Sequence, residues 1–134
     1  MAAFDFAKVK DPTFFKENVL NAHASFRTYA SREEYLVGES SLALKLDGIW
    51  KFAYAKNYTS AIPGFEKTDY DCSGWDDIHV PAHIQMEGYD IPQYANVQYP
   101  WDGREEVQPG EIPQRFNPVA SYVKYFVLPE SMQG

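Results

Sequence analysis

The sequence predicts a mainly β chain whose sheet is incomplete, preceded by an N-terminal arm with short helical turns. The first observation is the aromatic share of 16% in 134 residues, because flat rings pack well on pleated, half-buried surfaces. The second is that about three strands can be recognised, whereas a β-sandwich contains about seven. We therefore expect part of one sandwich domain rather than a complete one.

The N-terminal arm comprises residues 1–45 and contains two helix-start signals. Asp11 can cap a turn whose first position is Pro12, where the fixed φ of proline suits a helix. Ser31 and Glu34 have capping-box spacing, in which each side chain accepts a hydrogen bond from a backbone N–H. Neither segment is long enough to be stable alone, so we expect an arm laid over another part of the protein.

Three strands are predicted after the arm. Aromatic residues recur at every second position at Trp50, Phe52 and Tyr54, which predicts the clearest strand of the chain. A second, shorter strand is expected to end at Pro81, because proline cannot donate a hydrogen bond to a sheet. The segment 121–128 is apolar on both faces, which is typical of a strand covered on two sides. The proline-rich chain between the last two strands excludes long regular elements.

The charge and the cysteine count exclude several classes of function. The net charge is −7 and the sequence pI is about 4.8, so we expect neither nucleic acid nor a membrane as a partner. Cys72 is the single cysteine and cannot form an internal disulfide. No apolar run approaches the about 18 residues that span a bilayer, and no export signal is visible, so a cytoplasmic location is expected.

No residue pattern predicts catalysis within this chain, so no catalytic residue is expected in it. The adjacent carboxylates Glu105–Glu106 and Asp76–Asp77 are interpreted as solvated loop charges, because sequence neighbours diverge instead of converging on one substrate atom. The three histidines lack the spacing of a zinc site, so no metal ligand is expected.

An ordered series of motifs from residue 46 onward resembles the β-galactosidase branch of glycoside hydrolase family 2. It opens with Leu-Asp-Gly-Ile-Trp-Lys-Phe at 46–52. Its most specific part is Gly-Tyr-Asp-x-Pro-x-Tyr-x-Asn-Val-x-Tyr-Pro at 88–100, which is closest to the β-galactosidases of that family. The remaining members of the series are Trp75 and the segments 78–81, 85–87, 117–122 and 128–130.

The resemblance implies that residues 46–134 form the first part of a jelly-roll β-sandwich, the sugar-binding domain of this family, which is galactose-binding-domain-like. A catalytic barrel with the two reactive glutamates would lie outside this chain. The resemblance to the β-galactosidase branch implies an enzyme that hydrolyses terminal non-reducing β-D-galactosyl residues, as in lactose, with retention. Its Mg²⁺ and Na⁺ ions are expected outside this region. By this resemblance the chain alone is inactive and holds no cofactor of its own.

Asn96 and Val97 are the substrate-binding residues that the resemblance implies. In similar enzymes the asparagine of the Asn-Val-x-Tyr-Pro motif hydrogen-bonds the galactosyl unit, which suits an amide that both donates and accepts. Val97 would line the same wall, and Tyr94 and Tyr99 would be buried loop anchors or, alternatively, rings that stack on the sugar. The alternative for Asn96 is an Asx turn that organises a proline-bounded loop.

Two other functions stay open at this point. The chain could be a freestanding carbohydrate-binding module, because jelly-roll domains often carry exposed aromatic residues. It could also be a subunit-assembly segment without catalysis, since its N-terminal arm resembles one that helps to hold subunits together. The expected partners are a β-galactoside substrate and the remainder of the β-galactosidase chain. A homo-oligomer is also expected, because an incomplete sandwich exposes apolar faces and strand edges.

Overall fold

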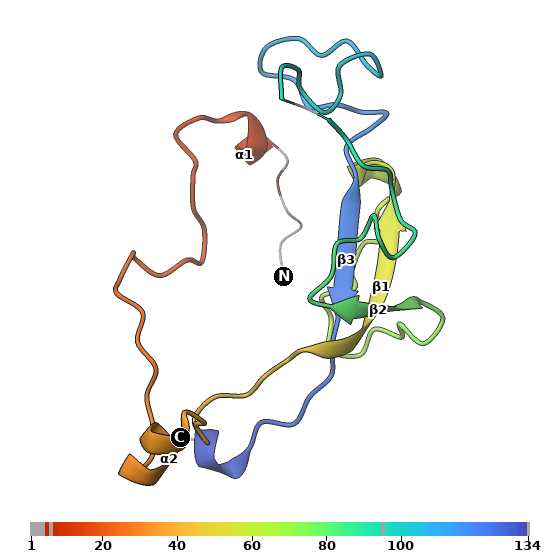
Figure 1. Ribbon diagram of the computed structural model, residues 1–134. Coiled ribbons are helices and arrows are strands. Elements are labelled where there is room, and N and C mark those ends of the chain that lie inside the picture. Colours follow the sequence, from red (N-terminus) through yellow and green to blue (C-terminus); the bar gives the residue numbers. More distant parts are fainter. Residues whose placement is uncertain (1–4, 6, 95, 134) are drawn as a thin grey trace. The chain divides into compact units, whose positions relative to one another are not determined.

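The computed structural model describes residues 5, 7–94 and 96–133 of the chain (Figure 1). Its elements are α1 (Ala7–Lys10), α2 (Arg32–Val37), β1 (Gly48–Ala55), η1 (Tyr58–Ser60), β2 (Asp76–Val80), β3 (Val119–Val123) and η2 (Glu130–Met132), where η marks a 3₁₀ helix. The helices are short, and the strands form one open antiparallel sheet, which confirms the predicted mainly β class and agrees with an incomplete sandwich. None of the described helices is long and apolar enough to cross a membrane.

The chain divides into two compact units, each described by itself. One unit combines residues 1–15 with 48–124 and contains the sheet. The other combines residues 16–47 with 125–134 and contains α2 and η2. The expected arm at 1–45 and domain at 46–134 are each continuous in the sequence. The two compact units are instead defined by contacts in space, and each combines two separate stretches of the chain.

Strand β1 is the centre of the sheet, whose order is β2-β1-β3 (Figure 1). Trp50 lies opposite Ile78 of β2, and Phe52 lies opposite Tyr122 of β3. All three predicted strands are therefore present. Strands β2 and β3 both pair with β1, so the two ends of the long connection between β2 and β3 are fixed on opposite edges of the same strand.

The third strand is shorter than predicted. It ends at Val123, although the apolar pattern continues to Leu128. The side chains of Tyr125 and Val127 beyond its end are 63% and 87% exposed. A strand that is apolar on both faces needs neighbours on both faces. The described strands form a single three-stranded sheet, so they provide no second sheet to cover this segment.

The core of the sheet unit is formed around Phe52, whose side chain is 1% exposed. Its ring centroid lies 4.9 Å from that of Tyr122 and 4.5 Å from that of Tyr89. Ile78 and the free thiol of Cys72 are also buried. The alternation that predicted β1 therefore also identified its buried face, since successive strand residues point to opposite sides.

The capping box at Ser31 is confirmed. The backbone N–H of Glu34 donates to Ser31 Oγ at 3.2 Å, and the N–H of Gly38 ends α2 by bonding to the carbonyl oxygen of Glu34. The carboxylate of Glu34 accepts from the N–H of Ala30 at 2.9 Å. It thus reaches one residue before the N-cap, whereas the usual capping box returns to the N-cap itself.

The turn at Asp11 is confirmed, but it does not lead into a helix. The N–H of Thr13 donates to Asp11 Oδ1 at 2.8 Å, which is the expected side-chain cap. The chain then leaves the helical conformation, and Phe15 is 82% exposed. Helix α1 lies just before this turn and was not predicted. An isolated helical turn is marginal without a packing partner, which explains why the cap is made but the helix does not continue.

We predict that Phe52→Ala destabilises the sheet unit by about 3–5 kcal/mol, because it removes a buried ring and leaves a cavity. Urea unfolding followed by tryptophan fluorescence measures the loss. The matched control is Ile49→Ala on the same strand, whose side chain is 45% exposed and should cost much less. Equal losses for the two variants would show that Phe52 is not the centre of the core.

Candidate functional site

The motif-bearing segment lies on a long loop, defined here as residues 81–118, which connects β2 to β3. The loop returns to the sheet at the end of β1, where the N–H of Asn117 donates to the carbonyl oxygen of Lys56 at 3.0 Å. In η1, directly after β1, Tyr58 Oη donates to Gln114 Oε1 at 2.8 Å. Figure 1 shows the outer part of the loop beyond this end of β1 and β3.

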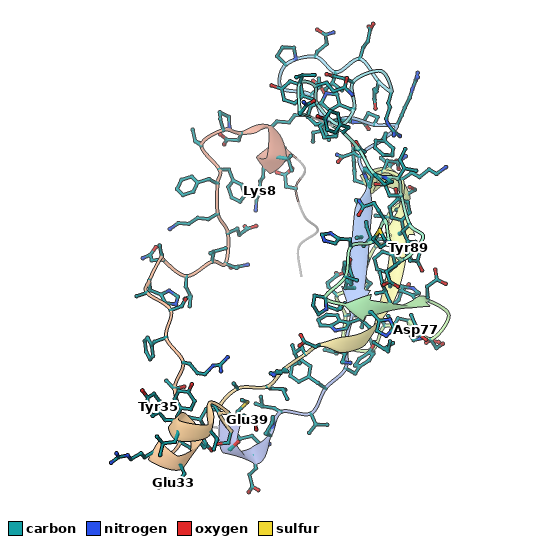
Figure 2. The ribbon with its side chains drawn as sticks, viewed as in Figure 1. Lys8, Glu33, Tyr35, Glu39, Asp77 and Tyr89 are labelled. Atoms are coloured by element: carbon teal, nitrogen blue, oxygen red, sulfur yellow. The ribbon has the colours of Figure 1, made fainter. Side chains whose placement is uncertain are left out.

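Tyr89 anchors the outgoing limb of the loop to the sheet. Figure 2 labels Tyr89 beside the sheet. Its ring packs against Phe52, and its hydroxyl donates to Asp76 Oδ2 at 2.9 Å. Burial, followed by this hydrogen bond, raises the pKa of Tyr89. The next residue, Asp90, accepts a hydrogen bond from Tyr54, whose pKa is raised by burial and then by the charge of Asp90. Two consecutive loop residues are thus fixed on β1 and β2.

Glu105 anchors the loop a second time. Its two carboxylate oxygens each accept the N–H of Gln114 at 2.8 Å, and Oε2 also accepts the N–H of Arg115 at 2.7 Å. Hydrogen bonds from the backbone of Arg115 and then of Gln114 lower the pKa of Glu105. The neighbouring side chain of Arg104 lies over the ring of Phe116, 3.9 Å from its centroid. The outgoing and returning limbs are therefore joined here.

The prediction of solvated loop charges holds only in part for the two carboxylate pairs, since Asp76, Asp77 and Glu106 are exposed. Glu106 is exposed, as expected for a solvated charge, but the interpretation is wrong for Glu105, which binds two backbone amides. Asp76 and Asp77 lie in β2 rather than in a loop. Asp77 pairs with Lys51 across the sheet at 2.8 Å, so both members have structural partners.

Asn96 and Val97 lie on the exposed part of the loop between the two anchors. Asn96 Nδ2 donates to Tyr94 Oη at 3.1 Å, and the side chain of Val97 is 88% exposed. Tyr94 and Tyr99 are 82% and 67% exposed, so their expected role as buried anchors is wrong. The ring of Tyr99 instead stacks on that of Trp101 at 5.2 Å with an interplanar angle of 4°.

Two shallow hollows lie beside this segment. The larger, of about 670 Å³, is lined by Tyr99, by residues 101–103 and by residues 105–111. The smaller, of about 260 Å³, is lined by residues 92–94, 98–100, 102 and 104. Neither Asn96 nor Val97 lines either of these two hollows. Among the described residues, no three histidine, cysteine or acidic side chains are grouped so that they could hold a metal ion.

The sequence patterns did not predict the anchoring contacts of Tyr89 and Glu105. A signal existed for Tyr89, which lies within the specific motif at 88–100 next to a glycine and an aspartate. Glu105 has no comparable signal, because its partners are backbone amides, which every residue type except proline would supply.

We predict a pH-dependent opening of the Glu105 anchor. Its pKa in the folded chain lies below that of an unfolded glutamate, which is about 4.3, so the stabilisation is complete above that pH. It is lost as the pH falls through the lower, folded pKa. The amide proton shifts of Gln114 and Arg115, followed by NMR, should report this transition. Glu105→Gln should abolish it, and an unchanged transition in that variant would contradict the assignment.

Known proteins with similar sequences share this segment. The family described as glycosyl hydrolases family 2, sugar binding domain, matches residues 43–134. The chain is 40% identical over 125 residues to the β-galactosidase of Streptococcus thermophilus, and the match covers 93% of this chain and 12% of that protein. It is 44% identical over 128 residues to the β-galactosidase of Halalkalibacterium halodurans, covering 94% of this chain and 12% of that protein.

A third relative is the β-galactosidase large subunit of Leuconostoc lactis, which is 33% identical over 136 residues, with 92% of this chain and 22% of that protein covered. The chain therefore spans 12% to 22% of the length of these relatives. The family match covers well over half of the residues, and it includes all three strands and the long loop. The chain belongs to family 2 of the glycosyl hydrolases, in the part that forms the sugar-binding domain.

Proposed function

We propose that this chain is the N-terminal segment of a β-galactosidase that hydrolyses terminal non-reducing β-D-galactosyl residues with retention. The observation that carries the proposal is that relatives named β-galactosidase match more than nine-tenths of the chain. The nucleophilic and acid–base carboxyl groups of a retaining glycosidase stand about 5–5.5 Å apart, and we assign both to polypeptide outside this segment. The segment then supplies scaffold and a loop that contacts the substrate.

The proposed roles of the two parts of the chain follow their order in the sequence. Residues 1–45 act as an arm, and residues 46–134 begin the sugar-binding domain, which is supported by a family match that starts at residue 43 and by a first strand that starts at Gly48. The remaining strands of the sandwich come from the rest of the enzyme. The proposed partners are that remainder, a β-galactoside and further subunits, and the proposed location is the cytoplasm.

Asn96 is proposed to hydrogen-bond the galactosyl unit, and Val97 to form the apolar wall beside it. The support is the Asn-Val-x-Tyr-Pro motif together with the exposure of both side chains. An amide offers two donor hydrogens and one acceptor oxygen, which suits a sugar hydroxyl that donates and accepts. The contact of Asn96 with Tyr94 Oη uses one donor hydrogen and holds the amide near an aromatic ring that could also face the sugar.

We expect the isolated 134-residue chain to leave a chromogenic β-galactoside unhydrolysed, whereas the complete enzyme chain that carries this segment hydrolyses it. The reason is that the reacting carboxyl groups belong to the part outside the segment. The assay uses chain that is purified free of host enzyme. Turnover comparable to that of the complete enzyme would overturn the proposal. Millimolar or tighter galactose binding by the isolated chain, measured by calorimetry, would favour a freestanding carbohydrate-binding module instead.

In the complete enzyme, Asn96→Ala should lower kcat/KM for β-galactosides about tenfold, which corresponds to the loss of one hydrogen bond of about 1.4 kcal/mol. Gln98→Ala is the matched control, because it removes an exposed amide two residues away on the same loop. Its effect should stay below about twofold, since exposed polar side chains contribute little. A similar loss in both variants would remove the reason for assigning the contact to Asn96.

A further inference from the structure

The two adjacent glutamates of the long loop differ sharply in their surroundings. Glu105 accepts hydrogen bonds from two consecutive backbone amides at 2.7–2.8 Å, whereas Glu106 is exposed. Hydrogen bonds to an ionised carboxylate are about twice as strong as those between neutral groups. Glu105 therefore stabilises the loop through contacts that its neighbour Glu106 does not make.

The amides that Glu105 binds belong to the limb of the loop that is already fixed to the sheet. Gln114 accepts a hydrogen bond from Tyr58 in η1 at 2.8 Å. Three residues later, the N–H of Asn117 joins the carbonyl oxygen of Lys56 just after β1. The Glu105 carboxylate thus connects the outer part of the loop to the rigid end of the central strand.

The segment between the anchors carries Asn96. Tyr89 fixes its beginning on Phe52 and Asp76, and Glu105 fixes its end. Most described residues between the anchors are exposed. Fixing both ends of a loop removes much of its conformational freedom, so the position of Asn96 depends on the two anchors more than on contacts of its own.

We propose that Glu105 is a positioning residue for galactoside binding, which holds the loop so that the Asn96 amide is presented to the sugar. This inference rests on the proposed contact between Asn96 and the galactosyl unit. Glu105 itself touches no substrate in this scheme. It acts by reducing the number of conformations that the free loop can adopt, so that less conformational entropy is lost when Asn96 contacts the sugar. This is a form of preorganisation.

The test is a double-mutant cycle in the complete enzyme, in which coupled residues give effects that do not add. The variants are Asn96→Ala, Glu105→Ala and their combination, with Glu106→Ala as the matched control for loss of a neighbouring charge. The measurements are kcat and KM for a chromogenic β-galactoside, and thermal melts followed by circular dichroism establish that each variant is folded. Glu105→Gln keeps one acceptor oxygen and provides a milder variant if Glu105→Ala does not fold.

We expect Glu105→Ala to reduce kcat/KM by about three- to tenfold, mainly through a higher KM, as the loss of a hydrogen bond and of loop order predicts. Glu105→Gln should fall between Glu105→Ala and wild type, and Glu106→Ala should match wild type within about twofold. In the Asn96→Ala background, the effect of Glu105→Ala should shrink to below about twofold, because the contact that it positions is already absent.

Three results would overturn the proposal, and they are distinguishable. Fully additive losses would show that Glu105 does not act through Asn96. Equal losses for Glu105→Ala and Glu106→Ala would show a general charge effect instead of an anchor. If Asn96→Ala has no effect while Glu105→Ala does, the proposed substrate contact itself fails, and Glu105 must act on another part of the enzyme.

Discussion

The packing of Phe52 between Tyr89 and Tyr122 is the contact on which the sheet and the long loop both depend. One neighbour belongs to β3 and the other to the start of the loop, so a single buried ring on β1 fixes two segments that follow it in the sequence. The hydrogen bond from Tyr89 to Asp76 extends this cluster to β2. Aromatic contacts of this kind contribute about 0.5–1.5 kcal/mol beyond the area that they bury.

Much of the fold could be predicted because its signals are local. The alternation at Trp50, Phe52 and Tyr54 and the capping box at Ser31 depend on neighbouring residues, and both are present in the structure. The end of β3 at Val123 could not be predicted in this way, because an apolar stretch forms a strand only where other segments cover it. The helical turn that follows Asp11 failed to extend for the same reason.

The site was predicted less completely than the fold. The motif at 88–100 predicted Asn96 and Val97 as site residues, and it contains Tyr89 as well, but a motif does not specify which side chains contact one another. Glu105 appeared as one of two equivalent carboxylates. Glu105 differs from Glu106 only because the folded chain brings the backbone amide of Gln114 next to it. The sequence does not show which backbone amides will lie near a given carboxylate.

The β2-β1-β3 strand order also constrains the route by which the sheet assembles. The connection between β1 and β2, residues 56–75, is shorter than the loop 81–118 that leads to β3, so the pairing of β1 with β2 can form first. Strand β3 must return across the whole proline-rich connection, and contacts of larger sequence separation form more slowly. The anchoring ring of Tyr89 can dock on the first strand pair beforehand, which shortens the part of the connection that is still free when β3 arrives.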